Sequence, residues 1–219
     1  MITVHHLEKS RSHRVLWLLE ELGVPYEMKT YARDPKTLLA PPVLAEVHPL
    51  GKSPVVVDGE STVAESAAIL EYLVDRHGEG RLVPKPGTPE HLKYRYWMHY
   101  AEGSAMSPLL LKLVFSEIKR KAPWPVKPIA KAIANQVLST FVDPNLATHF
   151  GWVESQLAKS PWFAGEEMTI ADIQMSYPVE GSFVRSDLGD RPKTRAWLDR
   201  VQARPAYQRA LEKGGPMFV

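Results

Sequence analysis

Cysteine is absent from the 219 residues of this chain. Without it the chain can form no disulfide, offer no thiolate to a metal ion and use no thiol of its own as a nucleophile. The eight histidines do not supply a metal site either. His5 and His6 are adjacent on a predicted strand, so their side chains point to opposite faces, and the others are scattered without ligand spacing. We therefore expect no bound metal.

The chain also lacks an excess of either charge. Its 27 basic and 25 acidic residues give a formal net charge of +2, which is too small to indicate nucleic-acid binding. No apolar run approaches the length of a membrane span, and the first residues, MITVHHLEKSRS, lack the apolar core of a secretory signal. We therefore expect a cytoplasmic protein. There is no phosphate loop, dinucleotide fingerprint or GxSxG elbow, so nucleotide-binding and hydrolase motifs are missing as well.

The most informative stretch runs from His48 to Tyr72. The β-branched residues of Pro54–Asp58 predict a buried strand, Asp58-Gly59 predicts a tight turn, and Ser61–Ala64 can return as the second strand of a hairpin. Glu65-Ser66 then begin a helix with apolar residues at helical spacing. Proline is tolerated where a strand begins, and this leaves the backbone N–H and C=O of Ser53 free to bind something other than protein. An ordinary hairpin followed by a capped helix would give the same pattern.

The residues before this stretch predict a β-α-β unit. Ile2–Leu7 and Tyr26–Tyr31 have the composition of strands, and the residues from Val15 to Leu22 carry an apolar helix face that ends at Gly23. The helix should begin in Ser10–Ser12, where either serine could cap it. Together with the hairpin and the following helix, this order predicts a thioredoxin-like α/β domain over residues 1–80.

A segment rich in glycine and proline, Gly78–Pro89, has the composition of a linker, and only helical patterns follow it. We expect an all-α domain over residues 88–219, with a long helix from Glu90 to Phe115 kinked at Pro108. A second long helix should run from Ile129 to Leu157 with an interruption near Pro144. Thr169-Ile-Ala-Asp172 is a capping box that should begin a core helix.

The two predicted long helices are separated by basic and aromatic residues beside prolines. These residues are Lys119, Arg120, Lys121, Trp124, Lys127 and Lys131. The combination could dock on an anionic membrane surface. We favour the simpler interpretation, a solvated tip between two helices.

In these motifs the chain resembles the cytosolic glutathione transferases, and most closely a Gtt-type branch of fungi and bacteria in which Ser-Arg follows the first strand. The resemblance covers Ser53-Pro54, the hairpin, Glu65-Ser66, the capping box and the closing segment Arg204–Ala210. It implies a cis Pro54, a homodimer, and glutathione as co-substrate, bound by Lys52, Ser53, Pro54, Glu65 and Ser66. In this assignment the Ser53 backbone pairs with the cysteinyl part, Glu65 and Ser66 hold the γ-glutamyl end, and Lys52 meets the glycine carboxylate.

The resemblance also implies a serine-type mechanism, in which a hydroxyl donates a hydrogen bond to the glutathione sulfur. Ser10 matches that position best and Ser12 second, although both serines could instead only cap the helix. We expect conjugation of glutathione to small hydrophobic electrophiles bound between the domains, or glutathione-dependent reduction of organic hydroperoxides. The alternative is a protein that binds glutathione or apolar ligands without turnover. Because the chain has no cysteine, the reactive sulfur must arrive with the ligand.

Overall fold

The computed structural model describes residues 1–218. Its first part is a four-stranded mixed sheet of β1 (Ile2–Leu7), β2 (Tyr26–Tyr31), β3 (Val55–Asp58) and β4 (Ser61–Ala64). The strand order is β2-β1-β3-β4. β1 is parallel to β2 and antiparallel to β3, and β3 and β4 form the predicted hairpin. The parallel pair requires a crossover, which α1 (His13–Leu22) provides.

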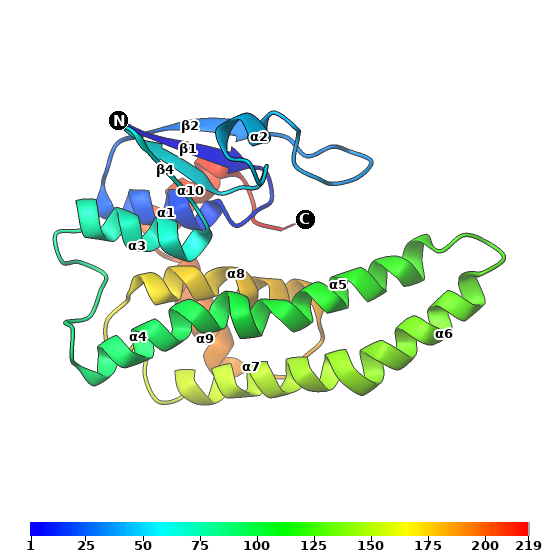
Figure 1. Cartoon of the computed structure of the whole chain (residues 1–219). Helices are drawn as coiled ribbons and strands as arrows, with labels where there is room; N and C mark the ends of the chain where they lie inside the picture. The colour runs from blue at the N-terminus through cyan, green and yellow to red at the C-terminus, as the bar shows by residue number, and fades with distance from the viewer. Residues whose placement is uncertain (219) are drawn as a thin grey trace.

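Helices cover the sheet on the side that faces the rest of the chain. α1 and α3 (Ser66–His77) lie between the sheet and the helical domain, while the short α2 (Leu44–Val47) lies near the far end of the sheet (Figure 1). The last helix, α10 (Pro205–Gly214), returns to pack against α1. This arrangement buries nearly all of α1, and it makes the fold a thioredoxin-like domain with an additional cover from the C-terminus.

The rest of the described chain is helical, as predicted. The remaining elements are α4 (Pro89–Tyr100), η1 (Ala101–Ala105), α5 (Met106–Lys121), α6 (Lys127–Val137), η2 (Leu138–Val142), α7 (Asp143–Leu157), α8 (Ile170–Arg185) and α9 (Pro192–Gln202), where η marks a π-helical segment. α8 is the central helix, since it contacts α1, α4, α5 and α9. The interruption expected near Pro144 is confirmed, because η2 ends directly before Asp143.

The predicted kink at Pro108 is wrong. The long helix is interrupted earlier, at the π-helical segment η1, and then continues past Phe115 to Lys121. A π turn already breaks the regular i to i−4 hydrogen bonds, so a proline just after it removes little that the helix would otherwise have. The Ser107 hydroxyl donates to the Gly103 carbonyl over 3.1 Å and so satisfies an acceptor inside the widened turn.

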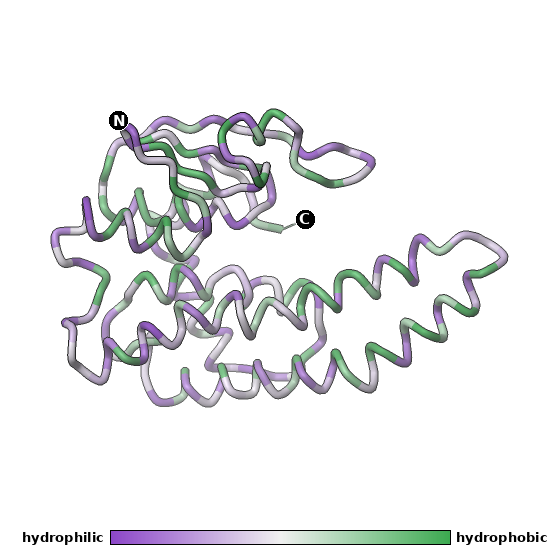
Figure 2. Tube along the Cα trace, in the orientation of Figure 1, coloured by the Kyte–Doolittle hydropathy of each residue, from purple (hydrophilic) through white to green (hydrophobic). Residues whose placement is uncertain are grey.

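The ends of α5 and α6 extend well beyond the body of the molecule as a two-helix hairpin (Figure 1). Apolar and polar residues alternate along both of these helices (Figure 2). The basic stretch from Lys119 to Lys131 forms the outer end of this hairpin, and Trp124 there is 87% exposed. Within residues 1–218, no helix combines the length and the apolar character needed to cross a membrane.

The capping box at the start of α8 is present, and its aspartate does more than cap the helix. Asp172 is 0% exposed and accepts hydrogen bonds from the Thr169 N–H (2.9 Å), the Phe163 N–H (3.0 Å) and the Trp197 indole N–H (3.0 Å). Burial raises the pKa of Asp172 to about 6, although these donors oppose the shift. A single carboxylate thus joins α8, α9 and the segment before α8.

We expect Asp172→Ala to lower the free energy of unfolding by about 3 kcal/mol or more, because it leaves several buried donors without an acceptor. Urea denaturation measures the change. The matched control is Asp199→Ala on the exposed side of α9, which should stay within about 0.5 kcal/mol of the wild type. Equal effects of the two substitutions would contradict a structural role for Asp172.

Candidate active site

Strand register brings the sequence-predicted residues to one end of the sheet. β3 pairs with β4 in the register Val55–Ala64, so Pro54 and Glu65 are neighbours across the hairpin. β1 pairs with β3 in the register His5–Val55, which carries the end of β1 to Ser53. Ser10 lies in the loop that follows β1. Residues from three separate segments therefore meet where β1 and β4 end and β3 begins.

Ser53 has the free backbone that the sequence indicated. Its hydroxyl donates to the His5 carbonyl (2.9 Å) and accepts from the Leu7 N–H (3.2 Å), so the side chain takes the place of a backbone ladder bond. The Ser53–Pro54 peptide bond is cis, as the resemblance implied. Among residues 1–218, no other backbone group bonds the N–H or C=O of Ser53. Both groups can therefore bind an extended peptide.

The N-terminus of α3 lies beside this backbone. Glu65 occupies the N-cap position with φ 72° and ψ 123°, and its side chain makes no capping bond. Ser66, the first helical residue, is buried, whereas Glu65 and Lys52 are exposed. The unpaired N–H groups of a first helical turn favour an anion such as a carboxylate. The exposed Glu65 carboxylate can pair with a cation next to that anion, a combination suited to an amino-acid end group.

Of the two serines that could cap α1, Ser10 accepts from the Ser12 N–H (3.2 Å) at the start of the helix, whereas Ser12 does not cap it. Ser12 occupies the N-cap position but makes no side-chain capping bond. Its hydroxyl lies 2.7 Å from the Ser10 hydroxyl and 2.8 Å from Nδ1 of His6, and Nε2 of His6 lies 2.8 Å from the Gly214 carbonyl oxygen. The serines therefore belong to a polar chain inside the α/β domain. Ser12 is 0% exposed and enclosed by this chain, while Ser10 forms its outer end.

His6 is neutral at the usual working pH. Burial lowers its pKa, and the Gly214 carbonyl and the Glu8 carboxylate oppose that shift only in part. His5 bonds the Tyr31 hydroxyl instead (2.8 Å), so the two histidines have separate partners, as their positions on β1 predicted. In the part of the chain that the structure describes, no three histidine, aspartate or glutamate side chains gather as metal ligands would.

A charged cluster links the Ser10 loop to the helical domain. Arg14 of α1 is 0% exposed and donates to Glu102 of η1 (2.6 Å) and to Gln174 of α8 (3.1 Å). Arg11, next to Ser10, pairs with the same Glu102 over 3.2 Å. Burial raises the pKa of Glu102, but Arg14 and Arg11 outweigh it, so the net pKa lies below its ordinary value. The carboxylate thus stays charged and holds both arginines.

Aromatic side chains on the helical domain adjoin this cluster. The guanidinium groups of Arg11 and Arg14 lie 5.1 and 5.2 Å from the centre of the Tyr177 ring, which packs against Phe218 with a centroid distance of 4.6 Å. A methyl group on Gly181 would meet both Phe218 and Leu109, so the C-terminal segment lies close to α5 and α8. These residues form an apolar surface beside Arg11, the residue that follows Ser10.

Other apolar and aromatic residues of the long helix predicted from Glu90 to Phe115 do not form one wall. Met106 is buried, Phe115 half-buried and Leu110 exposed. Tyr96 accepts a hydrogen bond from the Trp152 indole (3.2 Å) in a groove between α4 and α7. Sequence reasoning missed His6, Arg14, Glu102 and Tyr177. Only Arg14 gave a usable signal, because it is a charged residue directly beside the apolar face of α1.

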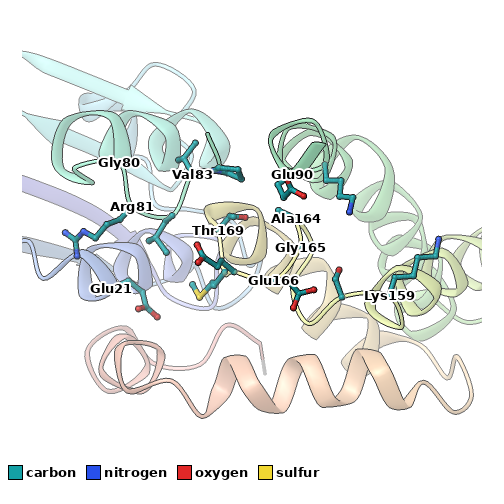
Figure 3. A pocket seen from close by; sticks show the side chains of 16 residues that line it. Glu21, Gly80, Arg81, Val83, Glu90, Lys159, Ala164, Gly165, Glu166 and Thr169 are labelled. Carbon is teal, nitrogen blue, oxygen red and sulfur yellow. The ribbon is translucent and has the colours of Figure 1, made fainter. Parts of the chain in front are cut away.

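A well-formed cavity lies elsewhere in the molecule. It has a volume of about 710 Å³ and lies at the C-terminal ends of α1 and α3, between Arg81, Glu90 and Gly165 (Figure 3). Ser10 and Glu65 are at the opposite, N-terminal ends of the same two helices. A ten-residue helix such as α1 is about 15 Å long. This cavity is therefore separate from the site at the sheet end.

We expect Glu65→Gly to stabilise the fold by up to about 2 kcal/mol, because a positive φ strains any residue with a Cβ and suits glycine. Thermal unfolding measures the change. Glu60→Gly, at an exposed turn position with an ordinary φ, is the matched control and should lose about 0.5–1 kcal/mol through chain entropy. A loss of stability in Glu65→Gly as large as in the control would show that Glu65 is not strained.

Comparisons with known proteins agree with this geometry. Residues 1–75 match the family described as "Glutathione S-transferase, N-terminal domain", and residues 126–214 match "Glutathione S-transferase, C-terminal domain". The chain is 38% identical to Glutathione S-transferase 3 of Schizosaccharomyces pombe over 97% of its own length and 88% of the relative. It is 30% identical to Glutathione S-transferase 1 of Saccharomyces cerevisiae over 97% of its length and 95% of the relative.

Solved structures give the same result. A glutathione S-transferase from Actinobacillus pleuropneumoniae is 33% identical and superposes with a TM-score of 0.80 over 98% of this chain and 93% of the other. A glutathione transferase from Phanerochaete chrysosporium, solved with oxidized glutathione, is 26% identical with a TM-score of 0.74 over 97% and 95%. The two yeast relatives are consistent with the fungal branch that the sequence resembled. The chain belongs to the glutathione S-transferase family.

Proposed function

We propose that this protein is a cytoplasmic glutathione transferase that joins the glutathione thiolate to small hydrophobic electrophiles. The observation that carries the proposal is the meeting of three groups at one sheet end: the unpaired Ser53 backbone, the N-terminus of α3 and the Ser10 hydroxyl, the outer end of the polar chain. Residues 1–80 would bind glutathione, and residues 88–219 would contribute the electrophile site.

In this proposal glutathione lies as an extended peptide along the sheet end. Its cysteinyl part pairs with the backbone of Ser53, the residue before the cis bond to Pro54. Its γ-glutamyl carboxylate binds at the N-terminus of α3 near Ser66, with the α-ammonium group on Glu65. Lys52 meets the glycine carboxylate. The strained backbone of Glu65 would have a use here if it holds the carboxylate beside the ligand.

Ser10 is the better choice for the hydroxyl beside the sulfur. Ser12 is enclosed by His6, Leu7 and Ser10, so a sulfur atom reaches Ser10 first. The electrophile would lie across from Ser10 against Tyr177 and Phe218. The same thiolate could reduce an organic hydroperoxide.

The size of the effect limits what Ser10 can contribute. A thiol of pKa about 8.5 is roughly 1% ionised at about pH 6.5, and a pKa lower by two units makes that about 50%. The weaker basicity reduces nucleophilicity by roughly 6- to 10-fold, so the net gain is about 5- to 8-fold. Most of the acceleration must come from holding the electrophile beside the sulfur.

We expect wild-type protein to lower the pKa of bound glutathione thiol by at least about one unit, and Ser10→Ala to restore it to about 8.5. Titration of the thiolate ultraviolet absorbance measures both. Ser139→Ala, an exposed serine on η2, is the matched control and should behave as wild type. Glutathione bound with an unshifted pKa in the wild type would favour the non-catalytic alternative, and absence of binding would leave only the fold.

We expect the protein to be a homodimer, as the family resemblance implies. Exposed apolar side chains support an interface at the groove of about 480 Å³ between α4 and α7, where Leu92 is 72% exposed beside Tyr96 and Trp152. Light scattering on a sizing column should give about twice the chain mass of 24.7 kDa. Leu92→Glu should shift the protein toward monomer, and the control Val184→Glu on α8 should not; a monomeric wild type contradicts the prediction.

A further inference from the structure

Ser10 is connected to a buried histidine through a second serine. The contacts are Ser10 Oγ to Ser12 Oγ (2.7 Å) and Ser12 Oγ to His6 Nδ1 (2.8 Å). At the inner end, His6 Nε2 lies 2.8 Å from the Gly214 carbonyl oxygen. The first two contacts form a continuous hydrogen-bonded path from Ser10 to the His6 imidazole. A proton from a sulfur atom beside Ser10 could follow this path.

The direction of the hydrogens follows from the inner end. A carbonyl oxygen can only accept, so Nε2 of His6 carries a hydrogen, and in a neutral imidazole Nδ1 is then an acceptor. Ser12 donates its one hydroxyl hydrogen to Nδ1 (2.8 Å) in preference to the more distant Leu7 carbonyl (3.2 Å), and Ser10 must therefore donate to Ser12. In this state the Ser10 hydroxyl also accepts from the Ser12 N–H (3.2 Å), so it has one lone pair left for a ligand and no hydrogen for a thiolate.

We propose that the thiol proton of bound glutathione is passed through Ser10 and Ser12 to Nδ1 of His6. The inference rests on the proposed function, since it requires the glutathione sulfur beside Ser10. The S–H bond breaks as its proton reaches Ser10 Oγ; the former Ser10 hydrogen goes to Ser12 Oγ, and the former Ser12 hydrogen goes to His6. Three hydrogens move by one position each, and the total charge of the complex is unchanged.

The transfer explains how Ser10 can stabilise the thiolate. After it, every hydrogen bond between the sulfur and Nδ1 is reversed, so Ser10 now donates to the sulfur while Ser12 donates to Ser10. The imidazolium donates from Nδ1 to Ser12 and from Nε2 to the Gly214 carbonyl, so neither N–H is left unpaired. His6 acts at a distance from the sulfur and is a positioning residue, not a catalytic one.

The surroundings of His6 fit a proton acceptor that works only when a thiolate is present. Burial lowers its pKa, which keeps the resting imidazole neutral. Glu8, just beyond β1, favours the charged form, while His13 of α1 has a pKa lowered to about 3 by burial and stays neutral. On α10, a Cβ at position 214 would come within 3.3 Å of Nε2, so glycine permits the close approach of the carbonyl.

The test measures where the thiol proton goes. At about pH 6.5 a thiol of pKa 8.5 is about 99% protonated, so forming the thiolate releases roughly one proton to solvent unless the protein keeps it. Glutathione binding is measured by calorimetry in two buffers of different ionisation enthalpy, and thiolate formation by ultraviolet absorbance on the same samples. We expect the wild type to form thiolate and release fewer than about 0.3 protons.

Two variants interrupt the path at different points. His6→Gln keeps an acceptor and a donor but cannot hold the extra proton, and Ser12→Ala removes the middle hydroxyl while leaving His6. In each variant we expect one of two results at about pH 6.5. Either the fraction of bound glutathione present as thiolate falls severalfold, or the thiolate forms with release of about one proton to solvent. In the wild type, the ¹⁵N signals of the His6 imidazole should move to imidazolium values with glutathione but not with S-methylglutathione, which has no thiol proton.

The outcomes separate the two proposals. A wild type that forms thiolate, releases about one proton and keeps a neutral His6 would overturn the transfer to His6 and leave the proposed function intact. Failure to bind glutathione, or binding only as the thiol, would overturn both. If His6→Gln does not fold, Ser12→Ala and the imidazole signals of the wild type still decide the question.

Discussion

The buried ion pair between Arg14 and Glu102 is the interaction on which the site depends. A guanidinium without solvent exposure is expensive to desolvate, and an unpaired one would be strongly destabilising. Glu102, Gln174 and the face of Tyr177 offset part of that cost from the helical domain, the two hydrogen bonds both engaging one guanidinium nitrogen. Because the arginine and its partners belong to different domains, the pair fixes how the α/β domain sits on the bundle.

Arg11 connects this ion pair to the loop that carries Ser10. The side chain of Arg11 shares Glu102 with Arg14, and its backbone lies between Ser10 and Ser12. The loop that carries Ser10 is therefore held from the helical domain through Arg11, and from inside the α/β domain through the hydrogen bond between Ser12 and His6. The π-helical segment η1 presents Glu102 at this point, and such segments occur often at functional sites. The long helix is therefore interrupted at η1, where Glu102 is presented, and not at Pro108.

The local pattern of the sequence was enough for the strands, α1, the hairpin and the capping box, since each depends on neighbours in the chain. It was also enough to place Ser53 and Glu65-Ser66, because a two-residue turn sets the register between β3 and β4. The polar chain and the ion pair could not be predicted in the same way. His6 and Gly214 are 208 residues apart and Arg14 and Glu102 are 88 apart, so only the packing of α1 against α8 and α10 brings them together. Ser12 was a candidate helix cap because the sequence pattern around it does not show that its hydroxyl bonds to His6.

The return of α10 to the first domain has a consequence for folding during synthesis. The carbonyl that holds His6 belongs to Gly214, the final residue of α10, and α10 covers α1. While the ribosome is still making the bundle, the α/β domain has its strands but neither the cover for α1 nor the inner partner of its polar chain. The nascent α/β domain therefore leaves the part of α1 that α10 covers exposed until α10 emerges, and the polar chain that ends at Ser10 is completed only then.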